Sequence, residues 1–170
     1  MNLGSIWSGL ENSPLGTTIA SSEWMFPTLE TIHVIAIVTV IGTIAIMDLR
    51  LVGLASGNRP VRTLAHDTLP VTWAAFALAA VSGSLLFVSK ASTYMVNPYF
   101  VAKFGLMAIA GVNMVLFHRY VSKDMDSWGV PGTSVPLNAK IAGVISLALW
   151  VAIPFCGRIT GFTLGVYVPA

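Results

Sequence analysis

Charged side chains are the class that this sequence most lacks. Lysine, arginine, aspartate and glutamate make up 9% of its 170 residues, whereas hydrophobic residues make up 55%. A soluble domain carries about 25% charged residues, so this is not the composition of an ordinary soluble protein. The formal net charge is only +2, which gives no electrostatic footprint for nucleic-acid binding. The composition predicts a membrane protein whose main partner is the lipid bilayer.

Cysteine and catalytic motifs are equally scarce. The single cysteine, Cys156, cannot form an intrachain disulfide. We find no nucleophile beside a general base, no phosphate-binding loop and no zinc-protease motif, which argues against a hydrolase or transferase. The start of the chain is too acidic, and its first apolar run too late, for a cleaved signal peptide, so we expect Met1 to be kept. We expect no independent enzyme, and at most a membrane subunit of an oxidoreductase.

Long apolar runs are what the sequence has instead. A helix needs about 20 mostly apolar residues to cross a bilayer core of about 30 Å. Four runs reach or approach that length, and they predict an all-α fold: one transmembrane domain over residues 1–170 that forms a four-helix bundle. Residues 1–27 predict short helices at the membrane interface, and residues 157–170 a tail. The four spans are expected at residues 28–47, 60–88, 100–118 and 137–156.

The basic residues predict an orientation. Three of the nine lie on the side of the acidic N-terminal segment, and six lie in or beside the connections between the first and second and between the third and fourth spans. The positive-inside rule places those connections in the cytoplasm. Both termini are therefore expected in the periplasm, with the chain in a bacterial inner membrane. The six residues are Arg50, Arg59, Arg62, Arg119, Lys123 and Lys140.

Small residues and proline predict details of the packing. Pro70 should kink the second span, and Asn97-Pro98 indicates a turn before the third. Small residues at every fourth position allow two helix backbones to approach closely. They are Ala75, Ala79 and Gly83 in the second span and Ala139 and Gly143 in the fourth.

Three ionisable residues fall near the outer ends of the spans. A charge at the centre of a membrane helix costs about 3 kcal/mol, so such residues are candidates for function. Glu30 and His33, three residues apart, share one face of the first helix, and Lys103 enters the third span from the same side. Together they predict a site for a metal, an ion or a quinone headgroup. The structural alternative is a Lys103 that extends to the interface beside a hydrogen-bonded Glu30 and His33.

Other polar residues have plainer explanations. Asp48 and Arg50 are expected to anchor the inner end of the first span, with Asp48 paired to a basic residue of a neighbouring helix; a proton or substrate gate is the alternative. Asn113 is expected to donate a hydrogen bond to another helix. Arg158 follows the fourth span and is a further polar candidate.

The three histidines raise the question of a b-type haem, whose iron takes axial imidazoles. At 1.5 Å rise per residue, His33 and His118 lie about 20 Å apart along the membrane normal. Two imidazoles on one iron have their nitrogens about 4 Å apart, so these two cannot share a haem. His66 and His118 can, if the second helix starts at Pro60 and His66 points inward. His33 or His118 alone could also hold a five-coordinate haem.

Copper is the other cofactor to weigh. Met107 and Met114 lie on one stripe of the third span, which ends at His118. Thioethers and imidazoles select Cu(I), so a path from Glu30 and His33 along the two methionines to His118 is conceivable. The plainer explanation of methionines at helical spacing is packing.

A likeness to a known family rests on six segments, NSPLG, WMFPTLETIHVIAI, MDLRLVGL, NPYFVAKFGLM, NMVLFHRY and LWVAIPFCGRITGF. Over almost its whole length the chain resembles an uncharacterised family of small bacterial inner-membrane proteins. That family has no assigned activity, so the resemblance implies a fold and a location but no reaction. The matching positions are Pro27, Glu30, His33, Asp48, Leu49, Arg50, Lys103, Phe117, His118, Gly157 and Arg158.

A more distant similarity links the chain to the copper-resistance D membrane proteins, which are thought to pass copper inward from a periplasmic carrier. It rests on the multi-helix architecture and an outer-side histidine. His66 lies outside the family pattern, which weakens its pairing with His118.

Three functions remain open at this point. The first is a redox or metal-handling subunit of an electron-transfer complex, with haem b or copper at the histidines. The second is an accessory or anchoring subunit, without cofactor, of a larger respiratory or photosynthetic complex. The third is copper uptake. Besides the lipid bilayer, the expected partners are other membrane or periplasmic subunits.

Overall fold

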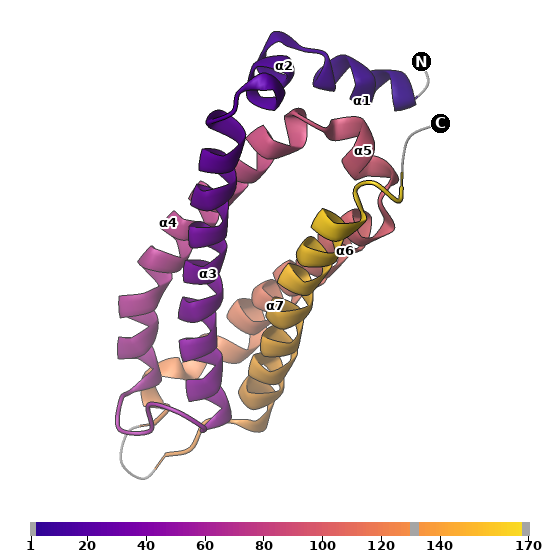
Figure 1. Ribbon diagram of the computed structural model, residues 1–170. Coiled ribbons are helices and arrows are strands. Elements are labelled where there is room, and N and C mark those ends of the chain that lie inside the picture. Colours follow the sequence, from indigo (N-terminus) through magenta and orange to yellow (C-terminus); the bar gives the residue numbers. More distant parts are fainter. Residues whose placement is uncertain (1–2, 130–132, 168–170) are drawn as a thin grey trace. The chain divides into compact units, whose positions relative to one another are not determined.

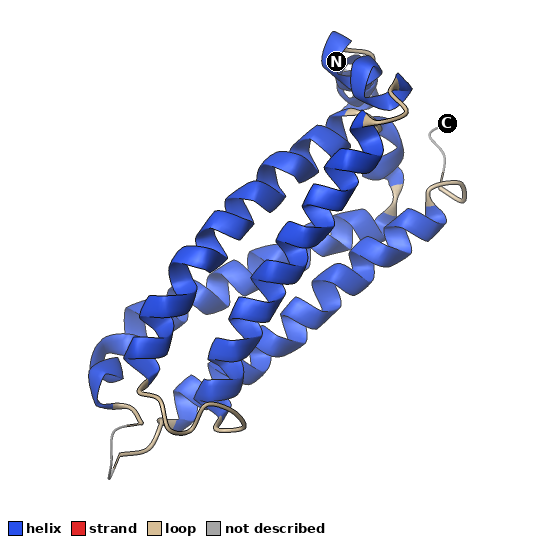
Figure 2. Cartoon of the chain, turned by 60° about the vertical axis from the view of Figure 1, so that its left-hand side comes forward, coloured by secondary structure: helices blue, strands red, loops and turns tan. Residues whose placement is uncertain are grey.

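The computed structural model describes residues 3–129 and 133–167. Within these residues the regular structure is entirely helical, as Figure 2 shows. Figure 1 labels the helices. In chain order the elements are α1 (Leu3–Glu11), α2 (Pro14–Ser21), α3 (Met25–Val52), α4 (Val61–Val88), α5 (Ala91–Val96), α6 (Pro98–Leu116), the π-helix η1 (Phe117–Val121), the 3-10 helix η2 (Ser122–Ser127) and α7 (Leu137–Thr163).

In the part of the chain that the structure describes, four helical stretches are long and apolar enough to cross a membrane: α3, α4, α7 and the run Pro98–Ser127. They contain 27 to 30 residues each, or at least about 40 Å at the rise of an α-helix. Large apolar side chains remain exposed on them, for example Val34, Ile35 and Val38 of α3. The predicted all-α, multi-pass fold is therefore confirmed.

The helices extend beyond the predicted spans. α3 begins at Met25 and ends at Val52, and α7 continues past Cys156 to Thr163. Hydropathy detects only the part of a helix that matches the hydrocarbon core, whereas the backbone stays helical into the interfacial layer. Pro70 lies inside α4, which continues on both sides of it.

The contacts divide the chain into two compact units, and each is described by itself. The first unit comprises the described parts of residues 1–38, 75–104 and 154–170, and the second comprises those of 39–74 and 105–153.

In the first unit, the N-terminal helices pack on α5. Ser13 caps α2 by accepting a hydrogen bond from the Gly16 amide at 3.1 Å, with Pro14 at the first helical position. The Glu11 carboxylate accepts from the Ser92 amide at 3.0 Å and from the Ser92 hydroxyl. Because Ser92 lies in the first turn of α5, this acidic side chain satisfies an amide that has no partner within the helix. α1 is thereby fixed to α5.

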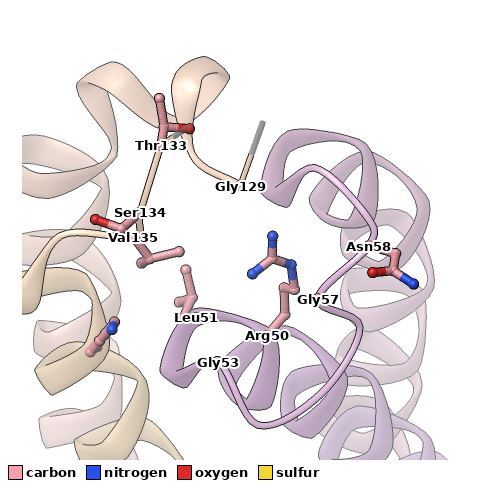
Figure 3. Close-up of a pocket in the computed structure, with 10 residues that line it drawn as sticks. Arg50, Leu51, Gly53, Gly57, Asn58, Gly129, Thr133, Ser134 and Val135 are labelled. Carbon is pink, nitrogen blue, oxygen red and sulfur yellow. The ribbon is translucent and has the colours of Figure 1, made fainter. Parts of the chain in front are cut away.

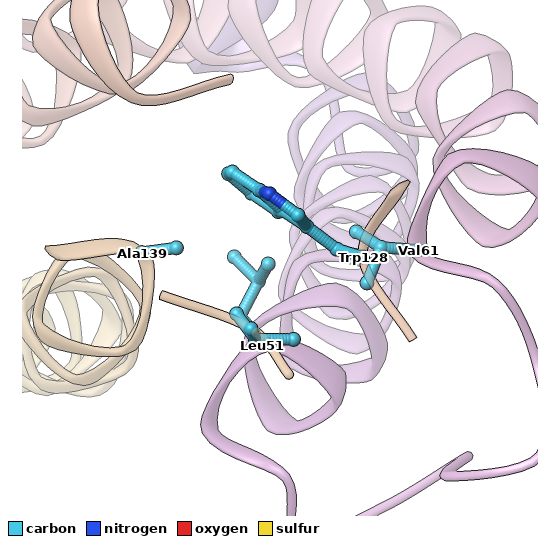
Figure 4. Close-up of a cluster of buried hydrophobic side chains, with 5 residues drawn as sticks. Leu51, Val61, Trp128 and Ala139 are labelled. Atoms are coloured by element: carbon cyan, nitrogen blue, oxygen red, sulfur yellow. The ribbon is translucent and has the colours of Figure 1, made fainter. Parts of the chain in front are cut away.

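In the second unit, a cluster of buried apolar side chains joins α3, α4 and α7 to the residues after η2. Figure 4 shows Leu51, Val61, Trp128 and Ala139 in this cluster. The Trp128 carbonyl also accepts from the Val61 amide at 3.3 Å. A Cβ atom on Gly143 would lie 3.3 Å from the Asp48 carbonyl. The small residues of α7 thus permit the close approach that their spacing predicted.

Candidate functional site

His33 of α3 is the polar residue of the first unit with the most informative surroundings. Its imidazole is half-buried, and its Nδ1 atom lies 3.0 Å from the hydroxyl of Ser82 on α4. Ser82 itself is buried and donates its one hydroxyl proton to the Leu78 carbonyl at 2.7 Å. With the proton of His33 on Nδ1, the hydroxyl oxygen accepts from Nδ1–H and Nε2 keeps its lone pair. The imidazole is also hydrogen-bonded to the backbone of Ala79 on α4.

Gly83, the residue after Ser82, makes room for this imidazole. A Cβ atom at Gly83 would lie only 2.7 Å from Cε1 of His33, closer than carbon atoms pack. Gly83 belongs to the small-residue pattern of α4. Its role is therefore more specific than close helix packing: it fixes where the ring of His33 can lie.

Lys103 of α6 is the charged neighbour of His33. It is half-buried, and its ammonium is near enough to act on the charge of the imidazole. A Cβ atom on Gly157 of α7 would contact its Nζ at 3.8 Å. We call this group of residues the His33 site. It takes residues from α3, α4, α6 and α7, namely His33, Ser82, Gly83, Lys103 and Gly157.

Glu30 points to a different partner. Its side chain is exposed, and its charge acts on Tyr94 of α5. Burial raises the pKa of Tyr94, and the Glu30 carboxylate raises it further. Of the three predicted residues, Lys103 is thus near enough to His33 for its charge to act on the imidazole, and the charge of Glu30 acts on Tyr94 of α5.

Arg158 lies outside this site. Its guanidinium stacks over the ring of Phe162 on α7, at 4.5 Å from the ring centroid. A cation over an aromatic face is stabilised by the ring quadrupole. The contact accounts for Arg158 without a ligand.

Asp48 and Arg50, in the second unit, are both buried, at 7% and 4% exposure. The Asp48 carboxylate is hydrogen-bonded by Ser146 of α7, and its Oδ2 atom has no hydrogen-bond partner. The ion pairs of the described residues do not include Asp48. The predicted pairing of Asp48 with a basic residue is therefore wrong, because α7 presents a serine to it.

Arg50 is held by backbone groups. Its Nε donates to the Arg59 carbonyl at 2.8 Å, across the loop from α3 to α4. Asn113 of α6 likewise donates to a carbonyl, that of Ala142 on α7, at 3.1 Å. The predicted interhelical hydrogen bond of Asn113 is confirmed.

The other two histidines are exposed. The side chain of His66 is 89% exposed, 3.8 Å from the carboxylate of Asp67, so the expectation that it points inward is wrong. His118 is exposed in the π-helix η1, and its Nδ1–H donates to the Met114 carbonyl at 2.9 Å.

The methionines of the predicted copper path differ in burial. Met107 is half-buried and Met114 is exposed. Both belong to the second unit, whereas Glu30 and His33 belong to the first. Among the residues that the structure describes, no three His, Cys, Asp or Glu side chains gather as a metal site would require.

Comparison with known proteins gives one match. The model of a family of unknown function, DUF6644, matches residues 10–163. The chain belongs to this family. No curated protein and no solved structure matches it. Membership of DUF6644 agrees with the resemblance to an uncharacterised family, and similarity to copper-resistance D proteins is not shown.

Sequence reasoning missed three groups of residues in this DUF6644 chain. Ser82 has no signal of its own, because a serine in an apolar helix usually bonds to its own backbone. The helix α5 was not predicted, since its six residues are too few for a periodic pattern; only the turn at Asn97-Pro98, which follows it, was indicated. A third group lines a cavity in the second unit, described below.

Proposed function

We propose that the chain is a membrane subunit with a redox role, and that the His33 site binds the redox group. The observation that carries the proposal is the 3.0 Å hydrogen bond between Nδ1 of His33 and the Ser82 hydroxyl, which orients the ring. In the tautomer with the proton on Nδ1, Nε2 is the ligand or acceptor atom. Metal-binding histidines usually donate their other ring N–H in this way. The same lone pair can accept the O–H of a hydroquinone.

The charge of Lys103 limits which redox groups the His33 site can bind. Its ammonium beside His33 makes a second bare cation unfavourable, because like charges at short range repel strongly in a medium of low dielectric constant. A group with carbonyl or carboxylate oxygens suits the pair, since Lys103 can donate to an oxygen. A quinone headgroup and a b-type haem with its propionates both have such oxygens. Copper has no comparable support here.

Spectroscopy of the purified protein tests this function. A Soret band that disappears in His33→Ala would identify haem, and a quinone in the lipid extract of the wild-type protein, lost in the same variant, would identify a quinone. His66→Ala is the matched control, because it removes an exposed histidine and should leave either signal unchanged. His118→Ala should also leave it unchanged.

The proposal fails if the protein, purified in mild detergent, has neither a haem band nor bound quinone. It also fails if His66→Ala removes the signal as fully as His33→Ala. Either result would favour the accessory subunit without cofactor. Co-purification with partner subunits would then be the next measurement.

A further inference from the structure

A cavity of about 520 Å³ lies in the second unit. It is formed by the end of α3, the loop that follows, residues 129 and 133–135, and the first turn of α7, as Figure 3 shows. Its volume falls within the range of about 300–1,000 Å³ that is typical of small-molecule sites. We call it the Arg50 pocket, after the buried arginine in its wall.

The wall of the Arg50 pocket carries positive charge only. Arg50 and Lys140 line it, and none of the described lining residues is acidic. Two carboxylates of the second unit are engaged elsewhere: Asp67 forms an ion pair with Arg59 at 2.7 Å, and Asp126 one with Arg62 at 3.1 Å. The two cations of the pocket are therefore not neutralised by these carboxylates.

Of the two cations in the pocket, Arg50 is the stronger indication that a ligand binds there. At 4% exposure it is nearly withdrawn from solvent, yet no ion pair of the described residues includes it. A buried charge is costly unless it is paired. Figure 3 shows its guanidinium directed into the space between Gly57 and Gly129. Backbone contacts with Arg59 and Gly129 fix its position without balancing its charge.

We propose that the Arg50 pocket binds a phosphate group. The guanidinium fork matches two oxygens of a phosphate, and Lys140 adds a point charge. Lys140 lies in the first turn of α7, where the helix dipole also favours an anion. Asn58 and Ser134 supply further polar groups in the lining.

Two sources of this phosphate are consistent with the location. The lining lies at the ends of α3 and α7, which are longer than the hydrocarbon core, and therefore at the depth of lipid headgroups. The open loops beside it also admit a soluble phosphate compound. The chemistry recognised is the same in both cases, and the experiment separates them.

Isothermal titration calorimetry in a non-ionic detergent tests the site at constant ionic strength. One arm uses inorganic phosphate, and the other uses dioctanoyl phosphatidate, a soluble lipid with a phosphate monoester headgroup. Lys140→Gln should weaken binding of whichever probe binds by about tenfold or more, as expected for loss of a charged hydrogen bond. Lys123→Gln is the matched control, because Lys123 is exposed in η2, carries the same charge and does not line the pocket.

The outcomes are distinct. Saturable binding of phosphatidate alone supports a lipid headgroup, and binding of inorganic phosphate that competes with phosphatidate supports a soluble ligand. The proposal is overturned if neither probe binds saturably, or if Lys123→Gln weakens binding as much as Lys140→Gln. Thermal unfolding of each variant is measured as well, so that loss of binding can be distinguished from loss of the folded structure. The result is independent of haem or quinone at the His33 site.

Discussion

His33 and Gly83 fit together so closely that the imidazole occupies the space where a side chain on residue 83 would begin. A Cβ atom there would lie 2.7 Å from Cε1 and 3.3 Å from Nδ1 of His33. The ring is thus confined by the backbone of α4 at Gly83 and hydrogen-bonded to Ser82 through Nδ1. An unrestrained imidazole samples several rotamers. A histidine that binds a ligand must be held in one of them by its neighbours, as Gly83 and Ser82 hold His33.

Gly83→Ala should therefore disturb His33 specifically. Alanine is the better helix former by up to about 1 kcal/mol, but displacing a packed ring costs about 1–3 kcal/mol. We expect a net loss of stability in thermal unfolding, and loss of any haem or quinone signal. Gly111→Ala is the control, because no atom lies within 4 Å of its added Cβ; it should be neutral or stabilising. Equal behaviour of the two variants would contradict this account of Gly83.

Asn97 is a second position where one side chain serves several contacts. It is fully buried, at 0% exposure, and its Oδ1 accepts from the amides of Tyr99 and Phe100 at 3.0 and 3.4 Å. It therefore caps α6, with Pro98 at the first helical position. Its Nδ2 donates to the Thr163 hydroxyl of α7 at 2.9 Å.

Asn97→Ala should destabilise the protein by about 2 kcal/mol, the sum of a lost cap and a lost buried hydrogen bond. Asn97→Ser keeps a neutral oxygen that can accept for the cap and loses the amide donor to Thr163, so it should cost about half as much. Chemical unfolding in detergent measures both. If the serine variant is as unstable as the alanine variant, the cap contributes nothing and the assignment is wrong.

The spans could be predicted from the sequence because hydropathy is a local property of each run. The same holds for Asn113, whose bond to the Ala142 carbonyl follows from the need of any buried amide for a partner. The surroundings of His33 could not be predicted. They depend on which helices adjoin and on their rotation, and four apolar helices of similar hydropathy do not determine either.

Asp48 and Arg50, at the end of α3, show a different limit of prediction from sequence. Sequence reasoning gave Asp48 a cationic partner, because a carboxylate in a membrane helix is costly alone. In the structure a serine of α7 contacts Asp48, and backbone groups hold Arg50. A buried polar side chain must have partners, but the sequence does not say whether they are charged, neutral or part of a ligand.

Asp48→Asn should accordingly leave stability nearly unchanged. The amide oxygen can still accept from Ser146, and no cation is lost, since no ion pair of the described residues includes Asp48. We expect a change within about 0.5 kcal/mol, or a midpoint shift of about 2 °C. Asp48→Ala, which removes the acceptor of Ser146, should cost more. A fall of more than about 5 °C in Asp48→Asn would show that the ionised carboxylate is stabilised by a charge.

A substitution at Gly129 tests whether the Arg50 side chain is held in a fixed position. Its backbone has a φ of +79°, and a Cβ atom there would overlap the Arg50 guanidinium. Gly53 has a similar φ of +92° but open space around its Cβ, so Gly53→Ala isolates the cost of the left-handed backbone, about 1–2 kcal/mol. Gly129→Ala adds the displacement of a buried arginine and should cost about 1–3 kcal/mol more in unfolding measurements. It should also loosen the loop that Arg50 ties to Arg59, seen as faster amide exchange after Val52. Equal costs at the two glycines would mean that Arg50 moves aside freely, and the buried guanidinium would then not be fixed by its surroundings.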